Sequence, residues 1–414
     1  MKEERGVCGL NRREIFYGTF LSISSLIIVI SFVLYPGEVF HSSLRGLTIW
    51  WEVVFPATLP FFVVAELLMG LGLAHFFGVL LEPVMRPLFN VPGAGSFVLA
   101  MGFSSGYPMA AKLTTLLRAK GLITKGEGER LVAFTTTSDP LFIFGAVAVG
   151  FFQRPLLGIF LAGIHYVTAV IVGLLMRFHD RRGKVTPVKE QEDFLLLRAF
   201  RAMNQARRED GRTLGKLLSE SVSRSIQTLL LIGGLIMIFS VFMKLLEVLH
   251  VSLLLKWAFQ GFLIFFHIPQ PLSISLVNGL FEVTLGVKSA ASEGIGIPLI
   301  HQVAMASAIL AWGGLSVHAQ IASILSQTDL SYKPLLVARL LHVGLATSGT
   351  YLLWDRTPSL SNTPTVPAFS RTFSLEDYWW QSVLYFTRFF YLLFALMICL
   401  GILLTLHQRL FKKD

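Results

Sequence analysis

Long apolar stretches separated by short polar ones make up most of the chain. Four stretches carry no Asp, Glu, Lys or Arg over roughly the 20 residues that a helix needs to cross a bilayer; they are Ile15–Tyr35, Pro155–Met176, Ile226–Met243 and Phe389–Leu406. Because lipid offers no hydrogen-bond partners, such segments fold as helices whose backbone groups pair internally. The pattern predicts an all-α polytopic membrane protein.

Applied to the whole chain, the pattern predicts eight spanning helices. They lie at 15–35, 49–72, 130–152, 155–177, 224–246, 299–326, 333–353 and 381–406. Two other apolar segments, 93–120 and 271–296, are interrupted by Gly, Ser and Pro. Irregular backbone at membrane depth is tolerated only inside protein or beside a water-filled cavity. We therefore expect each segment to form a re-entrant hairpin.

The charge distribution orients these helices. The chain is 54% hydrophobic and 14% charged, with a net charge of +10. Eleven Lys and Arg against six Asp and Glu fall between Arg177 and Lys216, and cytoplasmic loops carry such an excess. We expect both termini and residues 178–222 inside the cell, and residues 36–47 and 355–377 outside. The expected partner is the lipid bilayer and not nucleic acid.

The two halves of the chain resemble each other. Gly102 and His165 have counterparts in Gly279 and His342, each 177 residues later. An odd number of crossings separates equivalent points, so the repeats are inverted, and inverted repeats with interrupted helices are typical of secondary transporters. The expected organisation is a spanning helix at 1–35, a first repeat at 36–178, a basic cytoplasmic loop at 179–222, a second repeat at 223–353, a polar outer loop at 354–380 and a last spanning helix with its tail at 381–414.

Four interruptions are candidate sites, and the first lies in the hairpin at 93–120. Gly106 and Pro108 break the helix beside the hydroxyls of Ser104, Ser105 and Tyr107. The half-helix after Pro108 would direct free N–H groups to the membrane centre, which suits an anionic substrate. The alternative is a tight helix–helix contact through small residues.

The second interruption lies inside a spanning helix, where Thr136, Thr137, Ser138 and Asp139 precede a proline. A carboxylate at membrane depth costs about 2.5–3.5 kcal/mol and needs a partner. Asp139 would therefore hold a coupling proton or sodium ion. It could instead be a structural N-cap of the half-helix that follows.

The third interruption contributes Asn278, Glu282 and Lys288. Lys288 occupies the place in the second hairpin that Lys112 occupies in the first, so the two lysines would form a pair of substrate-binding cations. Glu282 and Lys288 could instead neutralise one another, and Lys112 could extend to the membrane surface.

The fourth interruption is a glycine pair that follows Trp312 and precedes Ser316, His318 and Gln320. The last three are spaced two apart, so an extended backbone would point them all one way. On a regular helix they would spread around the axis. We expect substrate contact from these four residues, with a packing role for His318 as the alternative.

The sequence lacks the motifs of zinc proteases and of P-loop enzymes. There is no H-E-x-x-H or P-loop, and Cys8 and Cys399 lack metal-ligand spacing. We expect no catalytic residue, no metal site and no cofactor beyond the coupling ion.

The interrupted segments carry a family resemblance. They read G-F-S-S-G-Y-P-M-A-A-K at 102–112, T-T-T-S-D-P at 135–140, N-G-L-F-E-V-T-L-G at 278–286 and G-G-L-S-V-H-A-Q at 313–320. They resemble the YlbJ family of sporulation integral membrane proteins, over about residues 15–406. That family carries two copies of the gate or nucleoside-recognition domain, which also occurs in nucleoside transporters, ferrous-iron transporters and spore maturation proteins.

The resemblance implies a function and a place. It implies transport of dipicolinic acid, an aromatic dianion, across the outer forespore membrane of an endospore-forming bacterium. It also allows a homo-oligomer, since gate-type transporters can be trimeric. Two other functions stay open at this point: a nucleoside or ion carrier of the same fold, and a structural or assembly protein of the forespore membrane.

Overall fold

The computed structural model describes residues 12–181, 183–187, 195–292 and 296–356, and this part of the chain contains helices and no strand. Its helices are α1 (Arg12–Leu34), α2 (Pro36–Ile49), η1 (Trp50–Val54), α3 (Phe55–Gly70), α4 (Leu73–Val84), η2 (Met85–Phe89), α5 (Gly95–Ser105), α6 (Tyr107–Ala119), α7 (Lys125–Thr135), η3 (Phe142–Phe151), α8 (Leu156–Met176), α9 (Leu195–Asp210), α10 (Leu214–Val248), α11 (Val251–Phe265), η4 (Gln270–Leu272), α12 (Ser273–Phe281), α13 (Val283–Ser292), α14 (Leu299–Trp312), α15 (Gly314–Leu325) and α16 (Lys333–Trp354).

Several of these helices suit a membrane. Five helical stretches of the described chain are long and apolar enough to cross one, namely Pro36–Gly70, Leu156–Met176, Leu214–Val248, Leu299–Leu325 and Lys333–Trp354. The chain is an all-α polytopic membrane protein, as predicted. The helix expected at 381–406 lies outside the described residues. The helix expected at 130–152 is divided into α7 and η3.

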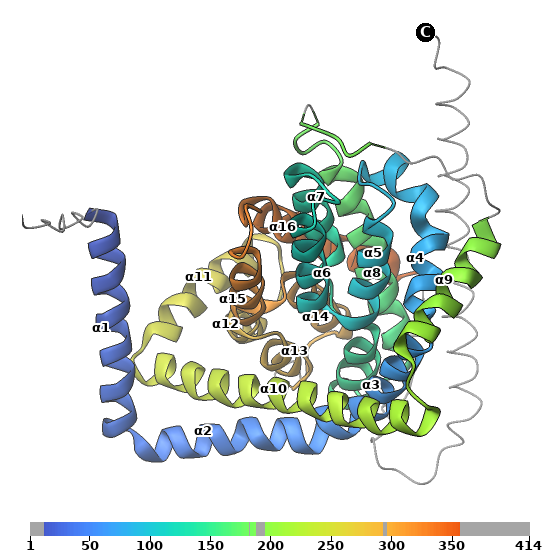
Figure 1. The fold of residues 1–414 in the computed structure, drawn as a ribbon. Coiled ribbons are helices and arrows are strands. Elements are labelled where there is room, and N and C mark those ends of the chain that lie inside the picture. Colours follow the sequence, from blue (N-terminus) through green and yellow to red (C-terminus); the bar gives the residue numbers. More distant parts are fainter. Residues whose placement is uncertain (1–11, 182, 188–194, 293–295, 357–414) are drawn as a thin grey trace, which may run out of the picture.

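Two 35-residue helices form the longest contact of the fold. α2, η1 and α3 make one continuous helix, Pro36–Gly70, which runs antiparallel along α10 (Figure 1). The direction follows from the contacts: the hydroxyl of Ser240 donates to the carbonyl of Ser42 (2.7 Å), and the indole N–H of Trp50 donates to the carbonyl of Leu229 (2.8 Å).

Residues 36–47, which were expected outside the membrane, form α2, and the helix expected at 49–72 therefore begins at Pro36. α10 supplies partners for the polar residues of this stretch. Besides the Ser42 contact, the Nζ of Lys244 lies 3.4 Å from a carboxylate oxygen of Glu38. Because α10 pairs with these polar side chains, they can remain on a helix without being exposed to water.

The two interrupted segments form the helical hairpins that were predicted from the sequence. α5 folds back on α6, and a Cβ placed on Gly102 would lie 2.8 Å from the Cβ of Ala110. α12 folds back on α13, and a Cβ on Gly286 would lie 2.3 Å from the Cα of Gly279. Glycine at these positions allows the two arms of each hairpin to touch.

The equivalent helices α8 and α16 also pack antiparallel. The rings of Phe160 and Trp354 lie 5.7 Å apart, and further along the pair the rings of His165 and His342 lie 4.7 Å apart. An inverted repeat requires its equivalent helices to run in opposite directions, and α8 and α16 do.

Two contacts mark the pseudo-two-fold axis between the repeats. His165 meets His342, 177 residues away, and Trp50 meets Leu229, 179 residues away. The first separation equals the repeat offset, so His165 meets its own counterpart, and the second exceeds the offset by two residues. A position lies beside its counterpart only at the axis, which therefore passes through the contact of His165 with His342 and close to the contact of Trp50 with Leu229.

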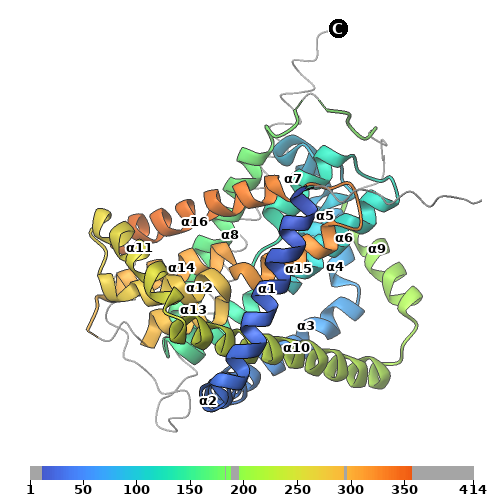
Figure 2. The same cartoon turned by 90° about the vertical axis from the view of Figure 1, so that its left-hand side faces the viewer.

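The predicted basic loop at 179–222 is partly helical. α9 lies within it and packs along α4, with the rings of Phe200 and Phe76 5.0 Å apart and Arg198 paired with Glu82. α10 begins at Leu214, inside the range expected for the loop. α9 and α11 lie at opposite ends of α10, while α1 stands away from the other helices (Figures 1 and 2).

An ion pair and a hydrogen bond connect the repeats at the end of the bundle that carries α7. Arg118, at the end of α6, donates to both carboxylate oxygens of Asp329 between α15 and α16 (2.8 Å each). These hydrogen bonds hold the pKa of Asp329 below its ordinary value. Glu129 of α7 accepts the backbone N–H of Ser331 (3.0 Å).

Candidate functional site

Four interruptions of helices lie against one another inside the bundle. A Cβ placed on Gly106 would lie 3.2 Å from Oδ2 of Asp139, so the first and second interruptions touch. A Cβ on Gly313 would lie 3.3 Å from the ring of Tyr107, so the fourth interruption touches the first. A Cβ on Gly314 would lie 3.0 Å from the Cα of Glu282, so the fourth also touches the third. We call the place where these four interruptions meet the central site; it contains residues of both repeats.

A buried arginine lies at the central site. Arg339 of α16 is 2% exposed, and its guanidinium donates to the carbonyl of Ala311 (3.2 Å) and to the hydroxyl of Thr136. It also lies over the ring of Tyr107, 5.4 Å from the centroid. Within the described part of the chain no carboxylate pairs with it, and its electrostatic partners are the hydroxyls of Tyr107 and Tyr332.

Arg339 was missing from the predicted site. Desolvating a cation costs several kcal/mol even after the protein relaxes, unless an anion compensates. An ionisable side chain at membrane depth is therefore a functional candidate by default. The signal in the sequence is a lone arginine inside the apolar span predicted at 333–353.

Both acidic residues of the central site cap half-helices. Oδ1 of Asp139 accepts the backbone N–H of Phe142 (2.8 Å), and Glu282 accepts the N–H of Leu285 (2.7 Å) and the hydroxyl of Thr284 (3.1 Å). Each carboxylate thus lies at a helix N-terminus, where the helix dipole favours negative charge. The geometry agrees with the structural alternative for Asp139, and the coupling role stays a prediction.

Aromatic residues surround the arginine. The hydroxyl of Tyr107 donates to the carbonyl of Leu310 (2.6 Å), and the ring of Trp312 lies 4.1 Å from that of His318. Nε2 of His318 donates to the carbonyl of Trp312 (3.0 Å), which leaves Nδ1 to accept from the hydroxyl of Tyr332. His318 therefore uses both ring nitrogens inside the protein, as the packing alternative requires.

The prediction of an extended backbone after the glycine pair is wrong. Gly313 takes the left-handed conformation (φ 87°), and the helix resumes at Gly314 as α15. Ser316 and His318 are buried, while the side-chain amide of Gln320 donates to the carbonyl of Ser316 one turn back (3.2 Å). The three side chains spread around a regular helix because the interruption ends before them.

Three other residues of the predicted site form hydrogen bonds within the protein. The hydroxyl of Ser104 donates to the carbonyl of Ala100 (2.9 Å), and that of Ser105 to the sulfur of Met69 (3.3 Å). The side-chain amide of Asn278 donates to a hydroxyl across its own hairpin (2.6 Å). Substrate contact by Ser104, Ser105 and Asn278 stays a prediction.

The structure does not bring the two predicted lysines to the central site. Lys112 is exposed on α6. Lys288 is half-buried on α13, where Arg45 repels it and Glu52 attracts it. The alternative that Glu282 and Lys288 neutralise one another is not found among the described contacts, and Arg339 supplies the buried cation at the central site.

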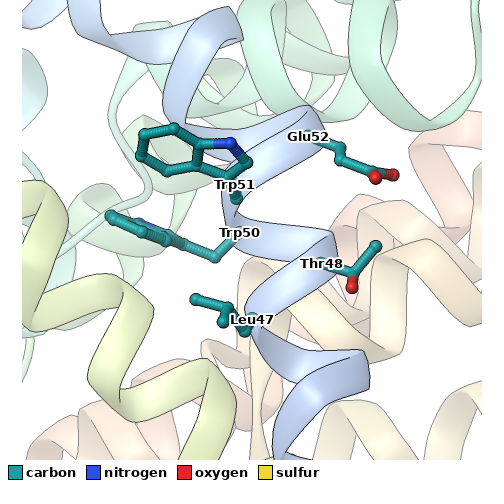
Figure 3. Close-up of a pocket in the computed structure, with 5 residues that line it drawn as sticks. All are labelled: Leu47, Thr48, Trp50, Trp51 and Glu52. Carbon is teal, nitrogen blue, oxygen red and sulfur yellow. The ribbon is translucent and has the colours of Figure 1, made fainter.

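A cavity of 460 Å³ lies beside the long helix pair and is distinct from the central site. Its lining residues are Leu47, Thr48, Trp50, Trp51 and Glu52. Figure 3 shows the two tryptophans on one side of their helix and Thr48 and Glu52 on the other. No predicted site residue lines it.

Two histidines complete the neighbourhood of the second interruption. Nε2 of His165 accepts the backbone N–H of Ser138 (3.1 Å), and the hydroxyl of Tyr166 donates to the carbonyl of Ser138 (2.8 Å). Nε2 of His342 lies 3.0 Å from the carbonyl of His165. Among the described residues, Oγ1 of Thr137 and Nδ1 of His165 are buried without a hydrogen-bond partner, and no group of residues suits a metal ion.

Comparison with known proteins shows which family the chain resembles. Residues 51–178 match the family described as Gate: Nucleoside recognition. The chain is 47% identical over 336 residues to the sporulation integral membrane protein YlbJ of Bacillus subtilis (strain 168), a match covering 80% of this chain and 81% of that protein. It is 29% identical over 152 residues to an uncharacterized protein of Alkalihalophilus pseudofirmus, covering 36% of this chain and 31% of that protein. No solved structure matches the chain.

Proposed function

The chain belongs to the family of the sporulation integral membrane protein YlbJ, and we propose that it transports a small organic anion, dipicolinic acid, across the outer forespore membrane. The observation that carries the proposal is Arg339, a buried cation for which the described residues provide no carboxylate partner. It lies where helix interruptions of both repeats meet. Interrupted helices of inverted repeats build the substrate sites of many secondary transporters.

An anion fits Arg339 better than other cargo does. Its present acceptors, the carbonyl of Ala311 and the hydroxyl of Thr136, are neutral, and a carboxylate would replace both with charge-assisted bonds in the bidentate geometry that guanidinium prefers. A cation would be repelled by the same group. A neutral nucleoside would not compensate its charge.

The aromatic surroundings favour a flat ligand. Dipicolinate has two carboxylates on either side of a ring nitrogen. Tyr107 offers a ring face to Arg339, and Trp312 directly follows the acceptor Ala311 in the chain. The relative in Bacillus subtilis bears sporulation in its name, and movement of dipicolinate from mother cell to spore would place this protein in the outer forespore membrane. A purely structural protein of that membrane would have no use for a buried charge that the described residues leave without a carboxylate.

Uptake by liposomes that contain only this protein tests the proposal. The parent should accumulate dipicolinate. Arg339→Gln removes charge-assisted hydrogen bonds of about 1.5–3 kcal/mol each, so affinity should fall by about tenfold or more, at 1.4 kcal/mol per tenfold. Arg224→Gln is the control, because Arg224 is exposed on α10 and lies 3.7 Å from its partner Glu220. Equal uptake by Arg339→Gln and the parent would contradict the site, and absence of dipicolinate uptake by the parent would contradict the substrate.

A further inference from the structure

The hydrogen bonds of His165 and His342 fix where their protons lie. The backbone N–H of Ser138 donates to Nε2 of His165 (3.1 Å), so this nitrogen is unprotonated and Nδ1 carries the hydrogen. A carbonyl only accepts, so Nε2 of His342 donates to the carbonyl of His165 (3.0 Å). Nδ1 of His342 is therefore the nitrogen with a free lone pair.

Both rings are buried beside a positive charge. His165 is 2% and His342 3% exposed, and their centroids are 4.7 Å apart on the pseudo-two-fold axis. Arg339, on the same helix as His342, interacts electrostatically with both rings. The ring of Tyr166 on α8 lies 5.4 Å from that of His165, and Tyr166 in turn interacts electrostatically with Asp139 at the second interruption and Tyr107 on α6.

We propose that the His165–His342 pair binds a coupling proton, so that a dicarboxylate and one proton are carried together. The inference rests on the proposed function and deepens it. Nδ1 of His342 accepts the proton, because its lone pair is free and no existing hydrogen bond has to break. Two protonated rings at this distance would repel each other, so the pair takes one proton.

Charge balance gives the reason for the coupling. A bound dianion brings two negative charges, and Arg339 compensates one of them. A proton on the pair compensates the second, so the loaded site carries no net charge at membrane depth, where uncompensated charge is expensive. Without an anion, Arg339 opposes a second positive charge next to it. Each ligand therefore favours binding of the other, and the two effects are equal by linkage.

A monocarboxylate separates this coupling from simple binding. Picolinate has the same ring with one carboxylate, and Arg339 alone compensates its charge. Picolinate should bind with little dependence on pH, whereas dipicolinate should bind more tightly as pH falls, by about 5–150-fold between the deprotonated and protonated pair. Both ligands must be compared at pH values where their carboxylates stay ionised.

The experiment measures binding of both ligands against pH for the parent, His342→Gln and His301→Gln. His342→Gln should hold dipicolinate at the weak affinity of high pH and lose the pH dependence. His301→Gln should behave like the parent, because His301 lies on α14 and bonds to Tyr351 (2.9 Å). In liposomes, influx of dipicolinate through the parent should acidify the lumen, and influx of picolinate should not.

Several outcomes would overturn the inference. One is a pH-independent dipicolinate affinity of the parent, a measurement that does not require any variant to fold. Another is a pH dependence that survives in His342→Gln but disappears in Asp139→Asn, which would assign the proton to Asp139. If the parent binds no dipicolinate at any pH, the proposed function itself fails; if it binds dipicolinate without pH dependence, only the coupling fails.

Discussion

Gly286 brings α13 into backbone contact with α12, and Gly286→Ala tests whether the hairpin depends on that contact. The added Cβ would lie 2.3 Å from the Cα and 2.6 Å from the N of Gly279. Carbon atoms in ordinary contact are about 3.5–4.0 Å apart, and neither atom of Gly279 belongs to a flexible side chain. The two helices must therefore move apart by about 1 Å or more.

The net effect on stability combines two opposing contributions. Alanine favours a helix over glycine by about 0.8–1 kcal/mol. Overpacking costs about 1–3 kcal/mol, and a contact between two backbones belongs at the upper end. We expect Gly286→Ala to lower the free energy of unfolding by about 2 kcal/mol. Uptake should fall too, because the hairpin holds Glu282 against Gly314.

Thermal unfolding of the purified protein in detergent, followed by tryptophan fluorescence, measures the effect. Gly234→Ala is the matched control, since nothing lies within 4 Å of its added Cβ in the interior of α10. The control should unfold at or above the temperature of the parent, and Gly286→Ala below it. If Gly286→Ala unfolded as late as the control, α12 and α13 would not be in contact and the packing argument would be wrong.

Two further predictions concern Asp139 and the orientation of the chain. Asp139→Asn should keep both folding and uptake, because asparagine is also a good N-cap; loss of concentrative uptake in a normally folded variant would instead give Asp139 the coupling ion. Gln205→Cys on α9, in a background with Cys8→Ser and Cys399→Ser, should react with an impermeant maleimide only from the cytoplasmic side, and reaction from outside would reverse the predicted topology.

The helix interruptions could be predicted because their causes are local. Gly106 and Pro108 end one helix and start the next within a few residues, and Gly313 does the same by its left-handed conformation. The repeat offset of 177 residues likewise follows from the sequence alone, and it returns in the contact between His165 and His342. These features need no knowledge of which helices touch.

The role of Arg339 depends on contacts between distant segments. Its acceptors, Thr136 and Ala311, lie 203 and 28 residues away, so the sequence offers a charge at membrane depth but not its surroundings. The lysines of the two hairpins match in sequence, yet Lys112 is exposed and Lys288 is half-buried near Arg45 and Glu52. A repeat offset identifies equivalent positions, but it does not say which of them lie near the axis.

The two longest helices of the described chain can pair only after the second of them has been synthesised. Chains emerge from the ribosome amino terminus first, so Pro36–Gly70 enters the bilayer long before its partner Leu214–Val248 has been synthesised. During that interval Gly46 and Trp50, which later touch Met237 and Leu229, face lipid or the insertion machinery. The contact thus forms between a helix that is made early and one that is made later, and two halves supplied as separate chains would have to assemble through the same contact.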